Sequence, residues 1–183
     1  FNAANGGPAP EALTAKMLTC SEEIAEYHLS DAEDVDLSAR GASSLDGMAV
    51  EVIDPVEDYA ELMQSLFDFK AIKRLFANGF SMRFDAMHAV TGPYAKAILE
   101  GALGGPAGTV INGVPSVDFG KGHPDPNPVW AKELMAEMMS ENAPDFGAAS
   151  DGDGDRNMIV GKGLYVTPSD SLAVLAANAH LAP

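Results

Sequence analysis

The chain has 183 residues, 46% of them hydrophobic, which is enough to bury one good core and leaves length for part of a second domain. Its 27 acidic residues outnumber 11 basic ones, and the formal net charge of -16, with no cluster of Lys and Arg, argues against nucleic-acid binding. The single cysteine, Cys20, allows no internal disulfide, and no apolar stretch reaches the roughly 20 residues of a membrane span. We expect a cytoplasmic protein.

The first 54 residues are expected to contain little regular structure. Apolar side chains at helical spacing predict a helix over residues 10–29, and the polar, acidic stretch at 30–48 predicts a loop or linker. Residues 49–53 predict a short strand, which Asp54-Pro55 would end. This part of the chain is therefore expected to be an incomplete α/β unit.

Helices and strands alternate through the rest of the chain. After two helices at 56–69 and about 70–78, the pattern predicts strands at 81–85, 109–114, 146–149 and 157–160, and helices at 90–103, 128–141 and 169–180. This alternation indicates a three-layer α/β/α domain around a four-stranded sheet. Only a tight loop fits between the last two strands, so the final strand should run antiparallel and make the sheet mixed.

The loop between those two strands has the most informative composition in the chain. Asp151, Asp153 and Asp155 alternate with two glycines, which permit the curvature that would bring three carboxylates onto one hard cation. Mg²⁺ suits this loop, because it prefers octahedral oxygen ligation and keeps positions for waters or substrate oxygens. Arg156 follows directly and can pair with phosphate oxygens. The sequence therefore predicts a magnesium site beside a phosphate-binding arginine.

Three other interpretations of this loop fit the sequence less well. A solvated Asp-Gly turn would not need three like charges within five residues. An EF-hand starting at Asp151 requires Gly at its sixth position and Glu at its twelfth, where this chain has Arg156 and Lys162. A calcium β-helix requires a Gly-Asp repeat, which does not recur. The metal loop remains the preferred interpretation.

Several segments together carry a resemblance to a known family. Besides the loop at 151–157, they are residues 5–11 (Asn-Gly-Gly-Pro-Ala-Pro-Glu), 84–88 (Phe-Asp-Ala-Met-His), 92–94 (Gly-Pro-Tyr), 123–127 (His-Pro-Asp-Pro-Asn), 145–149 (Asp-Phe-Gly-Ala-Ala) and 168–170 (Pro-Ser-Asp). In this order they resemble the phosphoglucomutase branch of the α-D-phosphohexomutase superfamily. The resemblance covers most of the chain and weakens through about 31–47.

The resemblance implies a fragment of a four-domain enzyme, in keeping with a chain that begins at Phe1 rather than Met. Residues 1–54 would be the C-terminal part of the first domain, 56–178 the second domain, and 179–183 the start of a linker to a missing third domain. The family's phosphoserine lies in a Thr-Ala-Ser-His motif that does not occur in this sequence. No catalytic residue is therefore expected within the fragment.

The resemblance also implies an activity for the whole enzyme. Glucose 1-phosphate and glucose 6-phosphate would interconvert through the phosphoserine and glucose 1,6-bisphosphate. Asp151, Asp153 and Asp155 would hold Mg²⁺, a phosphoserine oxygen would complete the site, and Arg156 would steady the phosphate. The partners would be the sugar phosphates and the missing domains, and the fragment alone would be inactive.

Two alternative functions stay open at this point. A haloacid-dehalogenase-like phosphatase would need a nucleophilic Asp-x-Asp-x-Thr after an apolar strand, but the nearest candidate, Asp34 to Ser38, follows an acidic stretch. The other alternative is a non-catalytic protein that binds a metal or a partner and is built on a mutase domain.

Three residues near the expected site have structural interpretations. His88 is expected to form a hydrogen bond at a boundary rather than to act in catalysis. Asn127 is expected to cap the following helix, with Pro128 at its first position. Ala89 stands where the family usually has glycine, so its backbone would be strained if it needed a positive φ.

Overall fold

The computed structural model describes residues 1–181 and divides the chain into two compact units, 1–53 and 54–183. Residues 182 and 183, the end of the expected linker at 179–183, lie outside the described part. A short 3-10 turn, η3 (Ala179–Leu181), precedes them. Within the described residues, no helix is long and apolar enough to cross a membrane.

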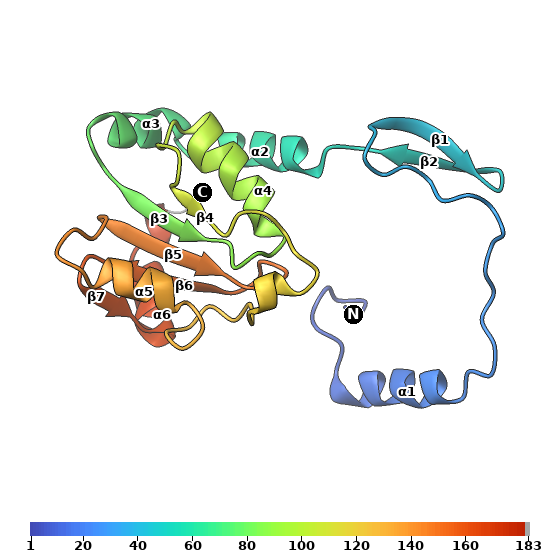
Figure 1. Cartoon of the computed structure of the whole chain (residues 1–183). Coiled ribbons are helices and arrows are strands. Elements are labelled where there is room, and N and C mark those ends of the chain that lie inside the picture. The colour runs from blue at the N-terminus through green and yellow to red at the C-terminus, as the bar shows by residue number, and fades with distance from the viewer. Residues whose placement is uncertain (182–183) are drawn as a thin grey trace. The chain divides into compact units, whose positions relative to one another are not determined.

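The first unit contains one helix and one hairpin (Figure 1). The helix α1 (Glu11–Glu22) ends seven residues before the expected limit at residue 29, and residues 24–30 have no regular structure. None of its side chains is buried. Because no apolar face of α1 is covered, tertiary packing does not extend the helix beyond what its local propensity supports.

The hairpin joins β1 (Gly41–Leu45) to β2 (Met48–Val52) in antiparallel register. The strand expected at 49–53 is present within one residue, but the loop expected at 30–48 is wrong over its last part, where β1 forms. Asp46 and Gly47 both adopt positive φ, at 47° and 81°. Asp-Gly in this conformation favours a two-residue hairpin turn, and this local signal explains the strand that the composition did not predict.

The second unit is built on a five-stranded mixed sheet in the order β4-β3-β5-β6-β7. The strands are β3 (Met82–Asp85), β4 (Val110–Ile111), β5 (Phe146–Ser150), β6 (Asn157–Gly161) and β7 (Leu164–Val166). Strand β3 pairs in parallel with β4 and with β5. Strand β6 is antiparallel to β5, as predicted, and β7 is antiparallel to β6. The expected number of four strands is wrong. The three-residue β7 follows a tight turn at Gly163 (φ 67°) and is too short to show a period-two pattern.

The helices of this unit are α2 (Pro55–Leu66), α3 (Phe69–Ala77), α4 (Thr91–Ala95), α5 (Lys132–Met138) and α6 (Pro168–Ala177), with a 3-10 turn η2 (Phe119–Lys121). The helix expected at 90–103 changes after Ala95 into a π-helix, η1 (Lys96–Ala102). The helix expected at 169–180 ends at Ala177. Side chains of Asp54, Asp68 and Thr167 cap α2, α3 and α6 by accepting backbone N–H bonds.

The helix expected at 128–141 is shorter than predicted. The side chain of Asn127 accepts from the backbone N–H groups of Val129 and Trp130, so it caps a turn rather than α5 itself. The regular helix begins at Lys132 and ends at Met138. The chemistry expected of Asn127 is present, but the predicted position of the cap is wrong by one turn.

Helices cover both faces of the sheet, which confirms the α/β/α class. On one face, Leu134 and Met138 of α5 pack in a buried cluster with Ala149 of β5 and with Met158 and Val160 of β6. Figure 1 shows α5 lying across these strands. On the other face, Ala95 of α4 and Leu99 of η1 pack with Phe84, Ala86 and Val110 around β3 and β4. The two clusters fix the ends of β3 and β5 side by side.

Candidate metal centre

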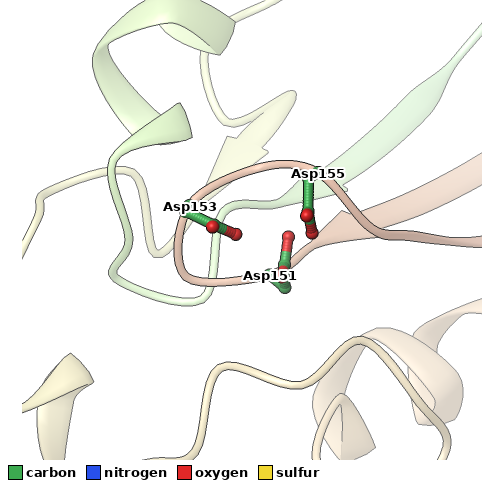
Figure 2. Close-up of side chains that lie close together, drawn as sticks. All are labelled: Asp151, Asp153 and Asp155. Atoms are coloured by element: carbon green, nitrogen blue, oxygen red, sulfur yellow. The ribbon is translucent and has the colours of Figure 1, made fainter. Parts of the chain in front are cut away.

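The loop from Asp151 to Arg156 connects β5 to β6, whose last paired residues are Ser150 and Asn157. Asp151, Asp153 and Asp155 each present one carboxylate oxygen, and these oxygens all lie within 4.8 Å of one another. Figure 2 shows the three side chains gathered inside the curve of the loop. The structure therefore brings together the three aspartates that the sequence singles out, in an arrangement that could hold a metal ion.

Asp151 organises the loop. Its Oδ1 accepts hydrogen bonds from the backbone N–H groups of Gly154 (3.0 Å) and Arg156 (2.9 Å), and its Oδ2 accepts from Arg156 Nε (2.9 Å). Gly154 has φ 84°, and a Cβ atom there would lie 2.7 Å from Thr91 Cγ2. Two features of this position therefore favour glycine, the positive φ and the lack of space for a side chain.

The pKa values of Asp151 and Asp155 are shifted in opposite directions. Burial raises the pKa of Asp151, but hydrogen bonds from the backbone and guanidinium of Arg156 outweigh burial and leave the pKa below its usual value. The charges of Asp153 and then Asp151 raise the pKa of Asp155. Repulsion among the carboxylates is thus only partly offset within the loop. An all-oxygen donor set with this excess of negative charge fits a hard divalent cation.

Arg156 contacts carboxylates from two segments of the chain. Its Nε bonds Asp151, and its Nη1 bonds Asp125 Oδ1 at 2.9 Å, while Asp155 Oδ1 lies 3.8 Å from Nε. The hydrogen bond to Asp151 raises the pKa of Arg156. Asp125 was missed as a site residue by sequence reasoning, which assigned only a local structural role to its segment. The ion pair forms between residues 31 positions apart, so no local pattern reports it.

The edge of the sheet beneath the loop is polar and tightly bonded. Asp85, buried at the end of β3, accepts from the Met87 backbone N–H (2.8 Å) and from Asn112 Nδ2 (2.9 Å). Thr91 Oγ1 and Ser150 Oγ lie 2.6 Å apart and link the start of α4 to the end of β5. Because β3 and β5 are parallel neighbours, their C-terminal ends meet at the same edge.

Near this edge φ is positive at Met87 (50°), His88 (55°) and Asn112 (51°) but not at Ala89, so the condition under which Ala89 would be strained is not met. His88 donates its backbone N–H to Asn112 O and accepts from Ser116 N at its carbonyl. Its ring Nδ1 lies 3.3 Å from Val114 O. These contacts tie two loops together and support the structural interpretation of His88.

A groove of about 740 Å³ extends from the loop between the sheet and helices α2 to α4. Of the described residues that line this groove, only Asp153 and Arg156 are charged, and both lie at the loop. The remaining lining is mostly apolar, with side chains such as Phe84 and Phe146. The charged side chains that line the groove therefore lie at its loop end. Fold and loop together define an α/β/α domain with a candidate cation site at the edge of its sheet.

Comparison with known proteins identifies the family. Residues 57–163 match the family model described as phosphoglucomutase/phosphomannomutase, alpha/beta/alpha domain II. The chain belongs to this family, as the sequence resemblance predicted. The family match does not support the haloacid-dehalogenase alternative. Asp34 and Asp36, its candidate residues, lie outside any strand.

Individual relatives agree with the family match. The chain is 60% identical over 183 residues to a phosphoglucomutase of Rhizobium radiobacter, covering 100% of this chain and 34% of that protein. It is 52% identical to a chloroplastic phosphoglucomutase of Arabidopsis thaliana, covering 98% and 29%. The open form of the phosphoprotein pp63/parafusin from Paramecium, a phosphoglucomutase, matches with TM-score 0.87 and 46% identity, covering 100% and 35%. The chain thus spans about a third of the length of these relatives.

Proposed function

We propose that this chain is the cation-binding part of a phosphoglucomutase that, when complete, interconverts glucose 1-phosphate and glucose 6-phosphate through a phosphoserine and glucose 1,6-bisphosphate. The observation that carries the proposal is the cluster of three carboxylate oxygens within 4.8 Å, in a domain of this family. The phosphoglucomutases among its relatives support the substrate class. A cytoplasmic location is part of the proposal; relatives include cytoplasmic and chloroplastic enzymes.

The proposed cation is Mg²⁺, held by Asp151, Asp153 and Asp155. Three monodentate carboxylates leave room in octahedral coordination for further oxygen ligands, which suits a phosphate. When bound, Mg²⁺ neutralises charge on a phosphoryl group during transfer. Asp151 can serve as a ligand because its carboxylate is ionised at neutral pH, as that of an ordinary aspartate is.

The other residues of the loop have supporting roles in the proposal. Arg156 places a permanent positive charge next to the carboxylates and can pair with phosphate oxygens through its remaining N–H groups. The backbone bonds to Asp151 stabilise the curve of the loop. Thr91 and Ser150 fix the base of the loop against α4. These contacts pre-organise the site, so that little ordering is left for the binding step.

The proposal includes a domain assignment. Residues 1–54 would be the C-terminal part of the first domain, 56–178 the second domain, and 179–183 the start of a linker to a third. The family match at 57–163 and the division of the chain at Ile53 support these limits. No Thr-Ala-Ser-His motif occurs in the sequence, so the phosphoryl donor would come from outside these 183 residues.

The test compares the chain alone with the chain extended by the flanking segments of its relatives. Conversion of glucose 1-phosphate is measured with Mg²⁺ and glucose 1,6-bisphosphate. We expect no turnover by the 183 residues alone, turnover by the extended chain, and a sharp loss with Asp153→Asn. Asp58→Asn, which removes one exposed charge from α2, is the matched control and should retain activity. Turnover by the chain alone that Asp153→Asn abolishes would contradict the proposal.

A further inference from the structure

Arg156 makes its two close ion pairs with Asp151 and Asp125, each at 2.9 Å. The Asp151 side chain is 3% exposed, whereas that of Arg156 is 60% exposed and can rearrange. Asp125 lies in the segment before α5, and its Oδ2 accepts a 2.7 Å hydrogen bond from Asn127 Nδ2. Asp125 is therefore fixed by its own segment and presents Oδ1 to Arg156.

Arg156 occupies an oxygen that a cation would use. Oδ1 of Asp151 already accepts two backbone N–H bonds, so Oδ2 has the greater remaining capacity for a cation. Arg156 Nε donates to that same Oδ2. Two positive charges on one carboxylate repel each other, and the repulsion is stronger near a buried group than in water. A cation bound at this carboxylate therefore weakens the bond between Arg156 and Asp151.

We propose that Asp125 is a positioning residue that holds Arg156 through Nη1 when the loop binds a divalent cation. The inference rests on the proposed function of the loop as a cation site. With Asp125 present, Arg156 keeps one carboxylate partner after it releases the other and stays beside the loop with N–H groups for a phosphate. Without that charge, the carboxylate partners of Arg156 are those of the loop itself, Asp151 and the more distant Asp155, and Arg156 competes with the cation for them. Asp125 thus raises the affinity of the loop for a cation, although Asp125 is not itself a ligand of that cation.

The experiment measures Mn²⁺ binding to the 183-residue chain by electron paramagnetic resonance, because Mn²⁺ accepts the same oxygen ligands as Mg²⁺. Asp125→Asn, Arg156→Gln and the double variant form a cycle. We expect Asp125→Asn to weaken Mn²⁺ binding about tenfold in the wild-type background and less than about twofold in the Arg156→Gln background, as for directly coupled residues. Equal weakening in both backgrounds, or none in either, would overturn the inference.

Two further measurements separate positioning from a general structural role. Asp125→Glu keeps the charge and should retain most of the Mn²⁺ affinity, so an Asp125→Glu protein that binds Mn²⁺ as weakly as Asp125→Asn would count against the inference. In nuclear magnetic resonance, Mg²⁺ should shift the Arg156 Nε–H signal of the wild type, and an unchanged signal at saturation would overturn the proposed release. Failure of the wild-type chain to bind Mn²⁺ at millimolar concentration would instead overturn the metal site itself, and the inference with it.

Discussion

The two units of the chain form regular structure for different reasons. Helices α1 and α2 each have 12 residues, and both units contain strands, yet no residue of 1–53 is buried, whereas the second unit contains two buried clusters. In the first unit, local signals such as the Asp46-Gly47 turn are sufficient to specify a hairpin. In the second unit, burial selects which faces and strand ends come together. Only the second arrangement can hold side chains from distant segments at fixed distances.

Hydrogen exchange provides the largest expected contrast. Amides of the central strand β5, which pairs on both sides, should exchange about a thousandfold or more slowly than those of the β1–β2 hairpin, because a coreless two-stranded hairpin opens at little cost. Residues 31–40, which have no helix or strand, should exchange fastest. Mass spectrometry of peptic fragments measures this. Similar protection in the hairpin and in β5 would show that the first unit is stabilised in a way its exposure does not reveal.

Leucine truncation tests the same contrast in free energy. Leu134 of α5 is 0% exposed in the buried cluster, so Leu134→Ala should lower the unfolding free energy by about 2–5 kcal/mol. Leu18 of α1 is 59% exposed, and Leu18→Ala should change it by less than about 0.5 kcal/mol. Urea unfolding followed by fluorescence of Trp130, the single tryptophan, reports on the second unit. Equal effects of the two substitutions would contradict the difference in burial.

Sequence reasoning predicted several helices and strands of the second unit well. The helices near α2 and α3 and the strands near β3, β5 and β6 were expected close to their observed limits. The π-helix η1 was not expected, since Ala95, Ile98 and Leu99 at i, i+3 and i+4 spacing are equally consistent with an α-helix. The strands β1 and β7 were missed for different reasons. A turn signal at Asp46-Gly47 was available for β1, whereas the three residues of β7 offered no comparable signal.

The residues of the candidate site also differ in whether the sequence could predict them. Asp151, Asp153 and Asp155 could be predicted because their spacing within one loop already limits how far their carboxylates can separate. Asp125 could not, because its contact with Arg156 depends on the fold bringing the segment before α5 to the loop. Its neighbour Asn127 also had a sufficient local explanation as a cap. Contacts between distant segments are therefore where the structure adds most to the function.

Two glycines with nearly equal φ, one in each unit, allow a further comparison of the two units. Gly154 and Gly47 have φ 84° and 81°, but a Cβ at Gly154 would lie 2.7 Å from Thr91 Cγ2, whereas one at Gly47 would meet nothing within 4 Å. Gly154→Ala should lower the unfolding free energy of the second unit by about 1–3 kcal/mol through strain and crowding. Gly47→Ala should leave the Trp130 transition unchanged. A shift of that transition by Gly47→Ala would mean that the hairpin contributes to the second unit.

The smallest expected effect is the pH dependence of a long-range contact made of two hydrogen bonds. Asp145 Oδ2 accepts from Ser81 N (2.9 Å) and Ser81 Oγ (3.0 Å), 64 residues away, and these bonds, the backbone one first, lower the pKa of Asp145. Because the pKa is lower in the folded state, this stabilisation is present above the unfolded value of about 3.9 and is lost as the pH falls through the folded value. Asp145→Asn should therefore be less stable than the wild type at pH 6, and the difference should shrink toward pH 3.

The matched residue in the first unit is Asp36, whose pKa is also lowered, first by the Ser38 hydroxyl and then by its backbone N–H. Its partner is only two residues away, so the bonds close a local turn and connect no distant segments. Asp36→Asn should leave the Trp130 transition unchanged from pH 6 to pH 3. The measurement is the urea midpoint of each variant relative to the wild type across this range. A deficit of Asp145→Asn that grows on acidification would reverse the sign argued for Asp145, and a pH-dependent deficit of Asp36→Asn would show that a local hydrogen bond in the first unit also stabilises the second.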